Sequence, residues 1–148
     1  MQLQQWQNNG WLRSHQTTAT QIGDLLAIVD RDLEDSRRDL STDWQFGIAY
    51  NAALKLCTIL LYASGYRPEK NLAHYRTLAA LPLILGSSHK DDADYLDACR
   101  AKRNTAEYDA AGTISQTEAI ELRSFAQELQ TDVIAWLKAN HPTLITSH

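Results

Sequence analysis

The sequence predicts an all-α protein, an up-and-down bundle of four to five main helices preceded by a short N-terminal helix. Apolar residues recur every three or four positions along each long segment, which places them on one face of a helix. No segment shows the strict alternation of apolar and polar residues that is typical of a strand, and no repeat or linker divides the chain. We therefore expect one domain over residues 1–148, with its core at about 21–137.

The first 40 residues predict two helices. Residues 1–8 form a short helix that is broken before Gly10, and Trp6 should fold back with its neighbours as a lid on the main body. Residues 21–40 predict an amphipathic outer helix. Its inward side chains are Ile22, Leu25, Leu26, Val29 and Leu33, and its solvent-facing charged side chains are Asp24, Arg31, Asp32, Asp35 and Arg38.

Residues 44–63 predict the central helix of the bundle. The preceding segment 41–43, Ser-Thr-Asp, is a strong helix start signal, and the helix that follows is apolar almost all round. Tyr50, Asn51 and Lys55 are its polar exceptions. Ser64 and Gly65 end the helix, because a glycine at this position caps its C-terminus. The segment 66–68, Tyr-Arg-Pro, then predicts a turn.

Two more long helices are expected, one before residues 91–109 and one after them. The first covers about 71–85, and Pro82 either kinks it or ends its regular part. The last long helix begins at a capping box formed by Ser115 and Glu118 and ends near Asn140. The expected inward side chains of the first are Leu72, Tyr75, Leu78, Ala79 and Leu81.

The helix predicted over residues 91–109 carries an unusual polar strip. Leu96, Cys99 and Arg103 lie on one line at helical spacing, and a guanidinium on an apolar line is rarely buried without a partner. Arg100, Asn104 and Tyr108 form a second line beside the first, at a spacing of four residues. Glu107 lies one helical turn beyond Arg103. The polar side chains of the strip are Arg100, Arg103, Asn104, Glu107 and Tyr108.

The residues alone leave two interpretations of this strip open. Arg103 and Glu107 can form an ordinary i,i+4 ion pair worth about 0.2–0.5 kcal/mol, with the Tyr108 hydroxyl in water. The same groups can instead form a binding site. Five residues turn about 140° around a straight helix, so Arg103 and Tyr108 converge only if the helix bends or a second subunit contributes.

Composition narrows the function classes. A net charge of −4 argues against a general nucleic-acid coat, whereas Arg100, Lys102 and Arg103 allow a local basic patch. Cys57 and Cys99 lack metal-ligand spacing and suit the core, so we expect no metal and no cofactor. No apolar run approaches the roughly 20 residues of a membrane helix and no signal peptide is evident. We expect a cytoplasmic protein without a membrane partner.

Two segments resemble a known family. RNTAEYD, residues 103–109, resembles the R-N-x-x-x-Y signature in the Tyr-containing prokaryotic branch of the HEPN domain (higher eukaryotes and prokaryotes nucleotide-binding). ASGYRPEKNLAHYRTL, residues 63–78, resembles the family's turn and its following His-containing helix, which makes His74 a second candidate for the polar groove. The resemblance covers roughly residues 21–136 and implies the same helical bundle, a homodimer and a groove for RNA or a nucleotide.

The resemblance also implies roles for individual residues. In HEPN ribonucleases an Arg and a His from two subunits meet across the dimer groove and cleave RNA without a metal. A phenol with a pKa near 10 is a poor general base at neutral pH, although it can donate a hydrogen bond or stack on a base. The implied nucleotide- or RNA-binding residues are Arg100, Arg103, Asn104, Glu107, Tyr108 and His74.

Three functions are therefore compatible with the sequence. The first is a dimeric HEPN-like binding module for RNA or a nucleotide, paired with a nucleotidyltransferase as in toxin–antitoxin systems. The second is a metal-independent endoribonuclease, with Arg103 and either Tyr108 or His74 as its catalytic candidates. The third is a helical scaffold without catalysis, in which the polar strip orders a dimer contact. We expect binding rather than catalysis.

Overall fold

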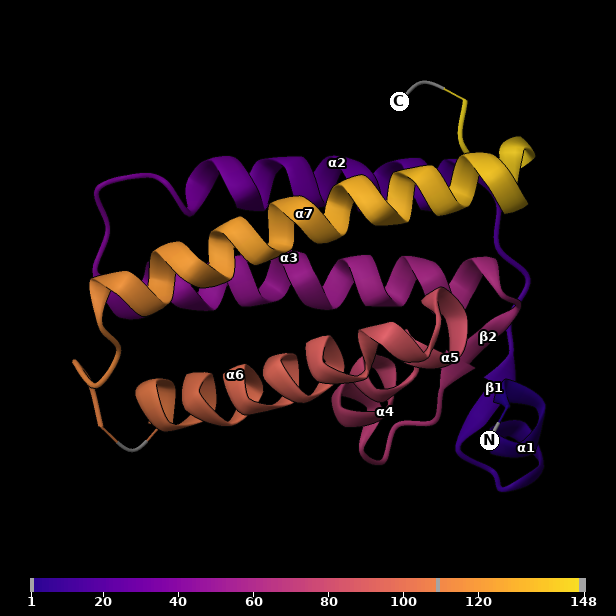
Figure 1. The fold of residues 1–148 in the computed structure, drawn as a ribbon, viewed down its shortest axis with the longest axis horizontal. Helices are drawn as coiled ribbons and strands as arrows, with labels where there is room; N and C mark the ends of the chain where they lie inside the picture. The colour runs from indigo at the N-terminus through magenta and orange to yellow at the C-terminus, as the bar shows by residue number, and fades with distance from the viewer. Residues whose placement is uncertain (1, 109, 147–148) are drawn as a thin grey trace.

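The computed structural model describes residues 2–108 and 110–146, and of Tyr108 it describes the backbone. It confirms an all-α helical bundle, in which successive long helices run in opposite directions (Figure 1). In Figure 1, α3 lies between the pair formed by α2 and α7 and the helix α6. The long helices are α2 (Ala19–Asp35), α3 (Thr42–Ala63), α6 (Lys90–Tyr108) and α7 (Gln116–Asn140).

Shorter elements gather at one end of the bundle (Figure 1). They are α1 (Leu3–Asn8), β1 (Leu12–Ser14), β2 (Tyr66–Pro68), α4 (Ala73–Ala79), α5 (Leu81–Leu85) and the 3₁₀ turn η1 (Ser87–His89), while a second 3₁₀ turn, η2 (Pro142–Leu144), follows α7.

The helix α3 is the centre of the core, as its sequence predicts. Phe46, Leu56 and Leu60 are at most 1% exposed, and they pack with apolar side chains of α2, α6 and α7. Alanines at positions 49, 52 and 53 are fully buried, which allows neighbouring helices to approach closely. By length and composition α3 could also cross a membrane, with a mean hydropathy of 1.4, but 67% of that apolar window is buried inside the protein. A position at the centre of a bundle accounts for its composition.

The N-terminal segment covers one end of α3. Trp6 and Leu12 are buried against Leu61 and Ala80 in a small second core, which agrees with the predicted lid. β1 and β2 form an antiparallel two-stranded sheet in which Leu12 lies opposite Pro68. The sequence predicts a turn at β2 and no strands, and this prediction is wrong. Strands of three residues are too short to show an alternating pattern.

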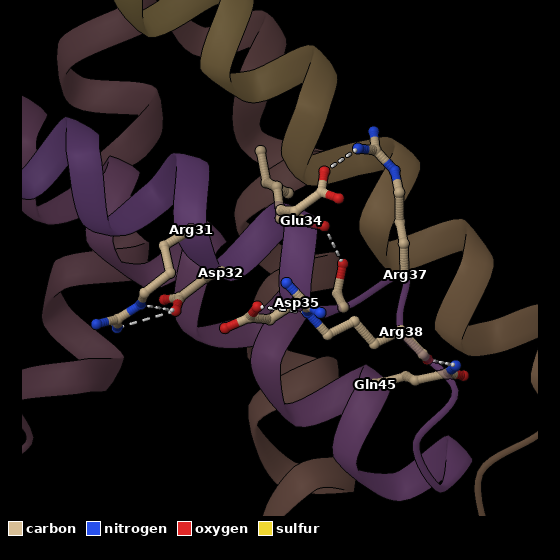
Figure 2. A network of polar contacts seen from close by, with 9 residues as sticks. Arg31, Asp32, Glu34, Asp35, Arg37, Arg38 and Gln45 are labelled. Atoms are coloured by element: carbon tan, nitrogen blue, oxygen red, sulfur yellow. Dashed lines mark hydrogen bonds and ion pairs between the residues drawn. The ribbon is translucent and has the colours of Figure 1, made fainter.

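The helix α2 ends at Asp35, five residues before the predicted boundary. Ser36 Oγ donates a hydrogen bond to the Leu33 carbonyl at 2.7 Å, and Gln45 Nε2 donates to the Arg38 carbonyl at 2.8 Å. Figure 2 shows this network, in which arginines just beyond the helix pair with the acidic side chains of its last turn. The polar side chains after Asp35 therefore bond to nearby backbone and carboxylates in a non-helical turn.

Asp32 is buried, with 7% exposure, although the sequence predicts it on the solvated face of α2. Its Oδ1 accepts a hydrogen bond from Arg31 at 3.1 Å, and its Oδ2 lies 3.7 Å from Lys55 Nζ of α3. The carboxylate is paired across the helix interface, which compensates for its removal from water.

The predicted helix over 71–85 is divided into α4 and α5. The division falls before Pro82, which occupies the second position of α5. Leu72 precedes α4 in a left-handed conformation, with φ of 56°, and is 55% exposed. Tyr75 is 45% exposed, whereas Leu78 is fully buried. The prediction that Leu72 and Tyr75 face inward is wrong because one helical periodicity does not run through both short helices.

Candidate functional site

The helix α6 directs its arginines toward α3. Leu96 and Cys99 anchor α6 in the core, and the helical spacing brings Arg103 to the edge of that buried face. The side chain of Arg103 is 22% exposed, and its Nη2 lies 3.2 Å from Glu107 Oε1. The i,i+4 ion pair predicted from the sequence is thus present in the structure.

Tyr50 of α3 lies beneath Arg103. Its side chain is fully buried, and the Arg103 guanidinium lies 5.4 Å from the centroid of its ring, within the range of a cation–π interaction. Gly47, one turn earlier on α3, faces the same groups, since a Cβ placed there would lie 3.9 Å from both Arg103 Nε and Glu107 Oε1. The absence of a side chain at Gly47 leaves the ion pair close to the backbone of α3.

Two buried polar atoms at this point lack hydrogen-bond partners among the described residues. They are Tyr50 Oη and Arg103 Nε. Burial raises the pKa of Tyr50 to about 12, even though the positive charges of Arg103 and Arg100 act in the opposite direction. Buried polar groups in native proteins are nearly always satisfied, so these two unpaired donors distinguish the contact between Tyr50 and Arg103 from the rest of the core.

His74 reaches the same region from α4. His74 is exposed by surface area, yet partial burial of its imidazole lowers the pKa below the ordinary value, and the positive charges of Arg103 and Arg100 lower it further. Lys55 of α3 adds a smaller effect of the same sign. The structure therefore brings together four of the predicted site residues, His74, Arg100, Arg103 and Glu107, and it adds Lys55. We refer to Lys55, His74, Arg100 and Arg103 as the basic cluster.

Neighbouring carboxylates hold two members of the basic cluster in place. Arg100 Nε donates a hydrogen bond to Asp97 Oδ1 at 2.8 Å, and Lys55 pairs with Asp32 as described above. A guanidinium carries five N–H donors, so Arg100 retains others after this bond is made. The cluster is thus preorganised by ion pairs from three different helices.

The other predicted site residues are placed differently. Asn104 is exposed on the surface of α6. Lys102 of the expected basic patch is turned away, since its Nζ forms an ion pair with Glu118 at the start of α7. The side chain of Tyr108 and the whole of Asp109 lie outside the described residues.

A pocket of about 590 Å³ lies beside the cluster, between the start of α3 and the end of α6. Trp44, in the first turn of α3, is 63% exposed and lines it. Asp43 also lines it, and its Oδ2 accepts a hydrogen bond from the Gly112 amide at 2.8 Å. Glu107 belongs both to the pocket lining and to the ion pair with Arg103. The pocket and the basic cluster are therefore adjacent.

Sequence reasoning assigns neither Tyr50 nor Trp44 to a site, because both belong to a nearly continuous apolar helix. The available signal is that Tyr50 and Lys55 interrupt that helix with polar groups. No three His, Cys, Asp or Glu side chains gather as a metal site requires in the part of the chain that the structure describes.

Comparisons with known proteins give no relative. No family model, no characterised protein and no solved structure matches the chain. A functional assignment therefore depends on the chemistry of the residues described above.

Proposed function

We propose that this protein is a HEPN-like module that binds RNA or a nucleotide through a phosphate held by the basic cluster. The observation that supports the proposal most directly is the partly exposed Arg103 side chain beside Arg100 and His74. A phosphate carries several acceptor oxygens, and arginine is the side chain best suited to bind it.

Charge supports a small anionic ligand. The whole chain has a net charge of −4, yet Arg103, Arg100 and Lys55 all act on His74. A concentrated positive potential within an acidic protein attracts one phosphate or a few. It does not provide the long basic track that a duplex requires, because each phosphate contact needs its own cation.

We also propose that the protein is a homodimer. The face of α3 that carries Ile48, Asn51 and Thr58 is only half-buried, whereas most of this central helix is buried. Together with Trp44 and Lys55 these residues form a line along α3 at spacings of three and four. A second copy packed over this line would cover it and close the groove above the basic cluster, as the HEPN resemblance implies.

Pairing with a nucleotidyltransferase, as in toxin–antitoxin systems, is a further part of the proposal and depends on the resemblance alone. The gene neighbourhood tests it. An adjacent nucleotidyltransferase gene supports a paired system, and its consistent absence from related genomes contradicts one.

A metal-independent endoribonuclease is the second candidate, and the state of His74 favours it. Because its pKa is lowered, the imidazole is neutral at pH 7 and able to accept a proton. In this scheme His74 takes the proton of the RNA 2′-hydroxyl as its oxygen bonds to phosphorus, and Arg103 stabilises the charge that develops on the phosphate. The bond from phosphorus to the 5′-oxygen of the next nucleotide breaks, which leaves a 2′,3′-cyclic phosphate, and the 5′-oxygen takes a proton from water. The test is cleavage of single-stranded RNA in the presence of a chelator. Cleavage that survives both Arg103→Ala and His74→Gln contradicts this assignment.

The binding function is tested by titrating the purified protein with short single-stranded RNA and with ATP. We expect wild-type protein to bind at least one of them and Arg103→Ala to lose that binding while remaining folded. Arg13→Ala is the matched control, since Arg13 is an exposed arginine of β1 that pairs with Glu69 and does not belong to the basic cluster. If neither ligand binds, the proposal fails in favour of a scaffold in which the polar strip orders a dimer contact.

A further inference from the structure

We infer that the pocket beside Trp44 takes a guanine base, so that the ligand of the basic cluster is a guanine nucleotide or an RNA with guanine at this position. The inference depends on the proposed phosphate site and deepens it, because it names the base. It is supported by the aromatic wall of the pocket, the chemistry of its polar lining and its distance from Arg103.

Trp44 provides a surface on which a base can stack. Its indole is 63% exposed although it belongs to the central helix, and it lines a pocket of about 590 Å³. This volume lies within the usual range of small-molecule sites. A nucleobase stacked on a tryptophan removes apolar surface from water, and stacking alone accepts any base. The choice among bases must therefore come from polar groups.

The charged groups that line the pocket are the carboxylates of Asp43 and Glu107. An ionised carboxylate only accepts hydrogen bonds. Asp43 Oδ2 receives the Gly112 amide, and Asp43 Oδ1 is buried and has no partner among the described residues. Glu107 Oε1 pairs with Arg103, which fixes its side chain at the pocket edge. The charged groups of the lining are thus all acceptors, and the Glu107 carboxylate, whose side chain is 31% exposed, is the one that the edge of a base can reach.

Guanine is the base that suits such acceptors. Its N1–H and its 2-amino group are two neighbouring donors on one edge, which match the two oxygens of a carboxylate. Adenine and cytosine place a ring-nitrogen acceptor beside their amino donor, and uracil has a single N–H between two carbonyl acceptors. Each of these would set a lone pair against a carboxylate oxygen, and a site built on specific hydrogen bonds rejects ligands that leave them unmade.

The position of the pocket fits the length of a nucleotide. Trp44 and Gly47 are three residues apart, about 4.5 Å along the axis of α3. Arg103 Nε and Glu107 Oε1 both lie 3.9 Å from the position of a Cβ on Gly47. In the proposed binding mode, a base in the Trp44 pocket directs its sugar and phosphate along α3 toward Arg103, and Gly47 places no side chain between them.

The test is calorimetric titration of the full-length protein with 5′-GMP, 5′-AMP, and short single-stranded RNAs with and without one guanine. We expect GMP, the guanine-containing RNA or both to bind at least about tenfold more tightly than the matched ligand without guanine. A preference seen only with RNA identifies an RNA ligand, and one seen with GMP identifies a free nucleotide. Equal affinities overturn the guanine inference and leave the phosphate site standing. Absence of all binding overturns both.

Single substitutions test which residues cause the preference for guanine over adenine. Glu107→Gln replaces an acceptor oxygen by an amide donor, so we expect the ratio of guanine to adenine affinities to fall at least severalfold. Asp94→Asn is the matched control, because Asp94 lies on the outer face of α6 in an exposed pair with Lys90, and it should leave the ratio unchanged. Trp44→Ala should weaken both ligands, and Trp44→Phe should restore much of the loss. A ratio that survives both Glu107→Gln and Asp43→Asn contradicts recognition by carboxylates.

Discussion

Arg103 lies over the ring of Tyr50, with its guanidinium carbon 5.4 Å from the ring centroid, and each of these side chains holds a buried polar atom without a partner among the described residues. Cation–π attraction accounts for their proximity and is worth about 0.5–2 kcal/mol depending on burial. It does not satisfy the Tyr50 hydroxyl or the Arg103 Nε–H. The contact therefore stabilises the fold although it leaves two buried polar atoms without a partner among the described residues.

Tyr50→Phe should keep the protein as stable as wild type or make it slightly more stable. The substitution retains the ring under Arg103 and removes a hydroxyl that makes no hydrogen bond in the described structure. An unsatisfied buried polar group costs about 1–3 kcal/mol, so its removal is not destabilising. Urea unfolding measures the difference. A loss of more than about 1 kcal/mol would mean that the hydroxyl is satisfied in solution.

Gly47→Ala should raise the free energy of unfolding by up to about 1 kcal/mol, which is the difference in helix propensity between Gly and Ala. The added methyl group fits, because its contacts with Arg103 and Glu107 are at 3.9 Å. Gly23→Ala in α2 is the control, since a Cβ there meets nothing within 4 Å. If the two variants gain equally but only Gly47→Ala weakens nucleotide binding, the methyl group obstructs the ligand. Destabilisation by Gly47→Ala would contradict the spacing described here.

His74 should make both stability and phosphate affinity depend on pH, in opposite directions. Its pKa in the folded protein is lowered from 6.5. The unfolded chain therefore binds the proton more readily, and the stability that His74 contributes is present above about pH 6.5 and is lost as pH falls toward the lowered value. Protonation adds a positive charge beside the arginines, so phosphate affinity should rise over the same interval.

The comparison variant for the pH experiment is His74→Gln, because inorganic phosphate itself titrates near neutrality. Its unfolding free energy should vary less with pH between about 5 and 7 than that of the wild type. The difference between the two proteins in phosphate affinity should grow as pH falls. Identical pH profiles for the two proteins would show that His74 does not face the basic cluster.

Light scattering should give about twice the chain mass of 16.7 kDa if two copies pack over the half-buried line of α3. Ile48→Lys places a charge in the middle of that line and should produce a monomer. Ile120→Lys is the control, since Ile120 is 43% exposed and belongs to a different helix, α7. A wild-type monomer at concentrations well above those of the binding assays would contradict the proposed dimer.

The helices could be predicted because each long segment buries one face. The periodicity of α7 and its capping box from Ser115 to Glu118 place that helix correctly from the sequence alone. The ion pair between Arg103 and Glu107 could be predicted for the same reason, because both residues lie on one helix. Local interactions of this kind are encoded in the spacing of neighbouring residues.

The rest of the site depends on contacts between elements. Nothing in the local spacing indicates that Asp32 of α2 is buried against Lys55, or that Tyr50 lies under Arg103. The sequence suggests that Trp44 is a core residue, because it belongs to an apolar helix. It is exposed in the structure because neither α2 nor α6 covers this part of α3. Pairing between β1 and β2 is equally non-local, since it joins residues more than 50 positions apart.

The break before Pro82 gives His74 a helix of its own, the seven-residue α4. Its imidazole is therefore carried by a short unit whose orientation depends on the buried side chains beneath it, Thr77 and Leu78. Changing the size of Leu78 should shift the imidazole relative to the arginines without altering any residue of the site. Substitutions on the underside of α4 can thus change the distance between the imidazole and the positive charges of Arg100 and Arg103 while those residues stay the same.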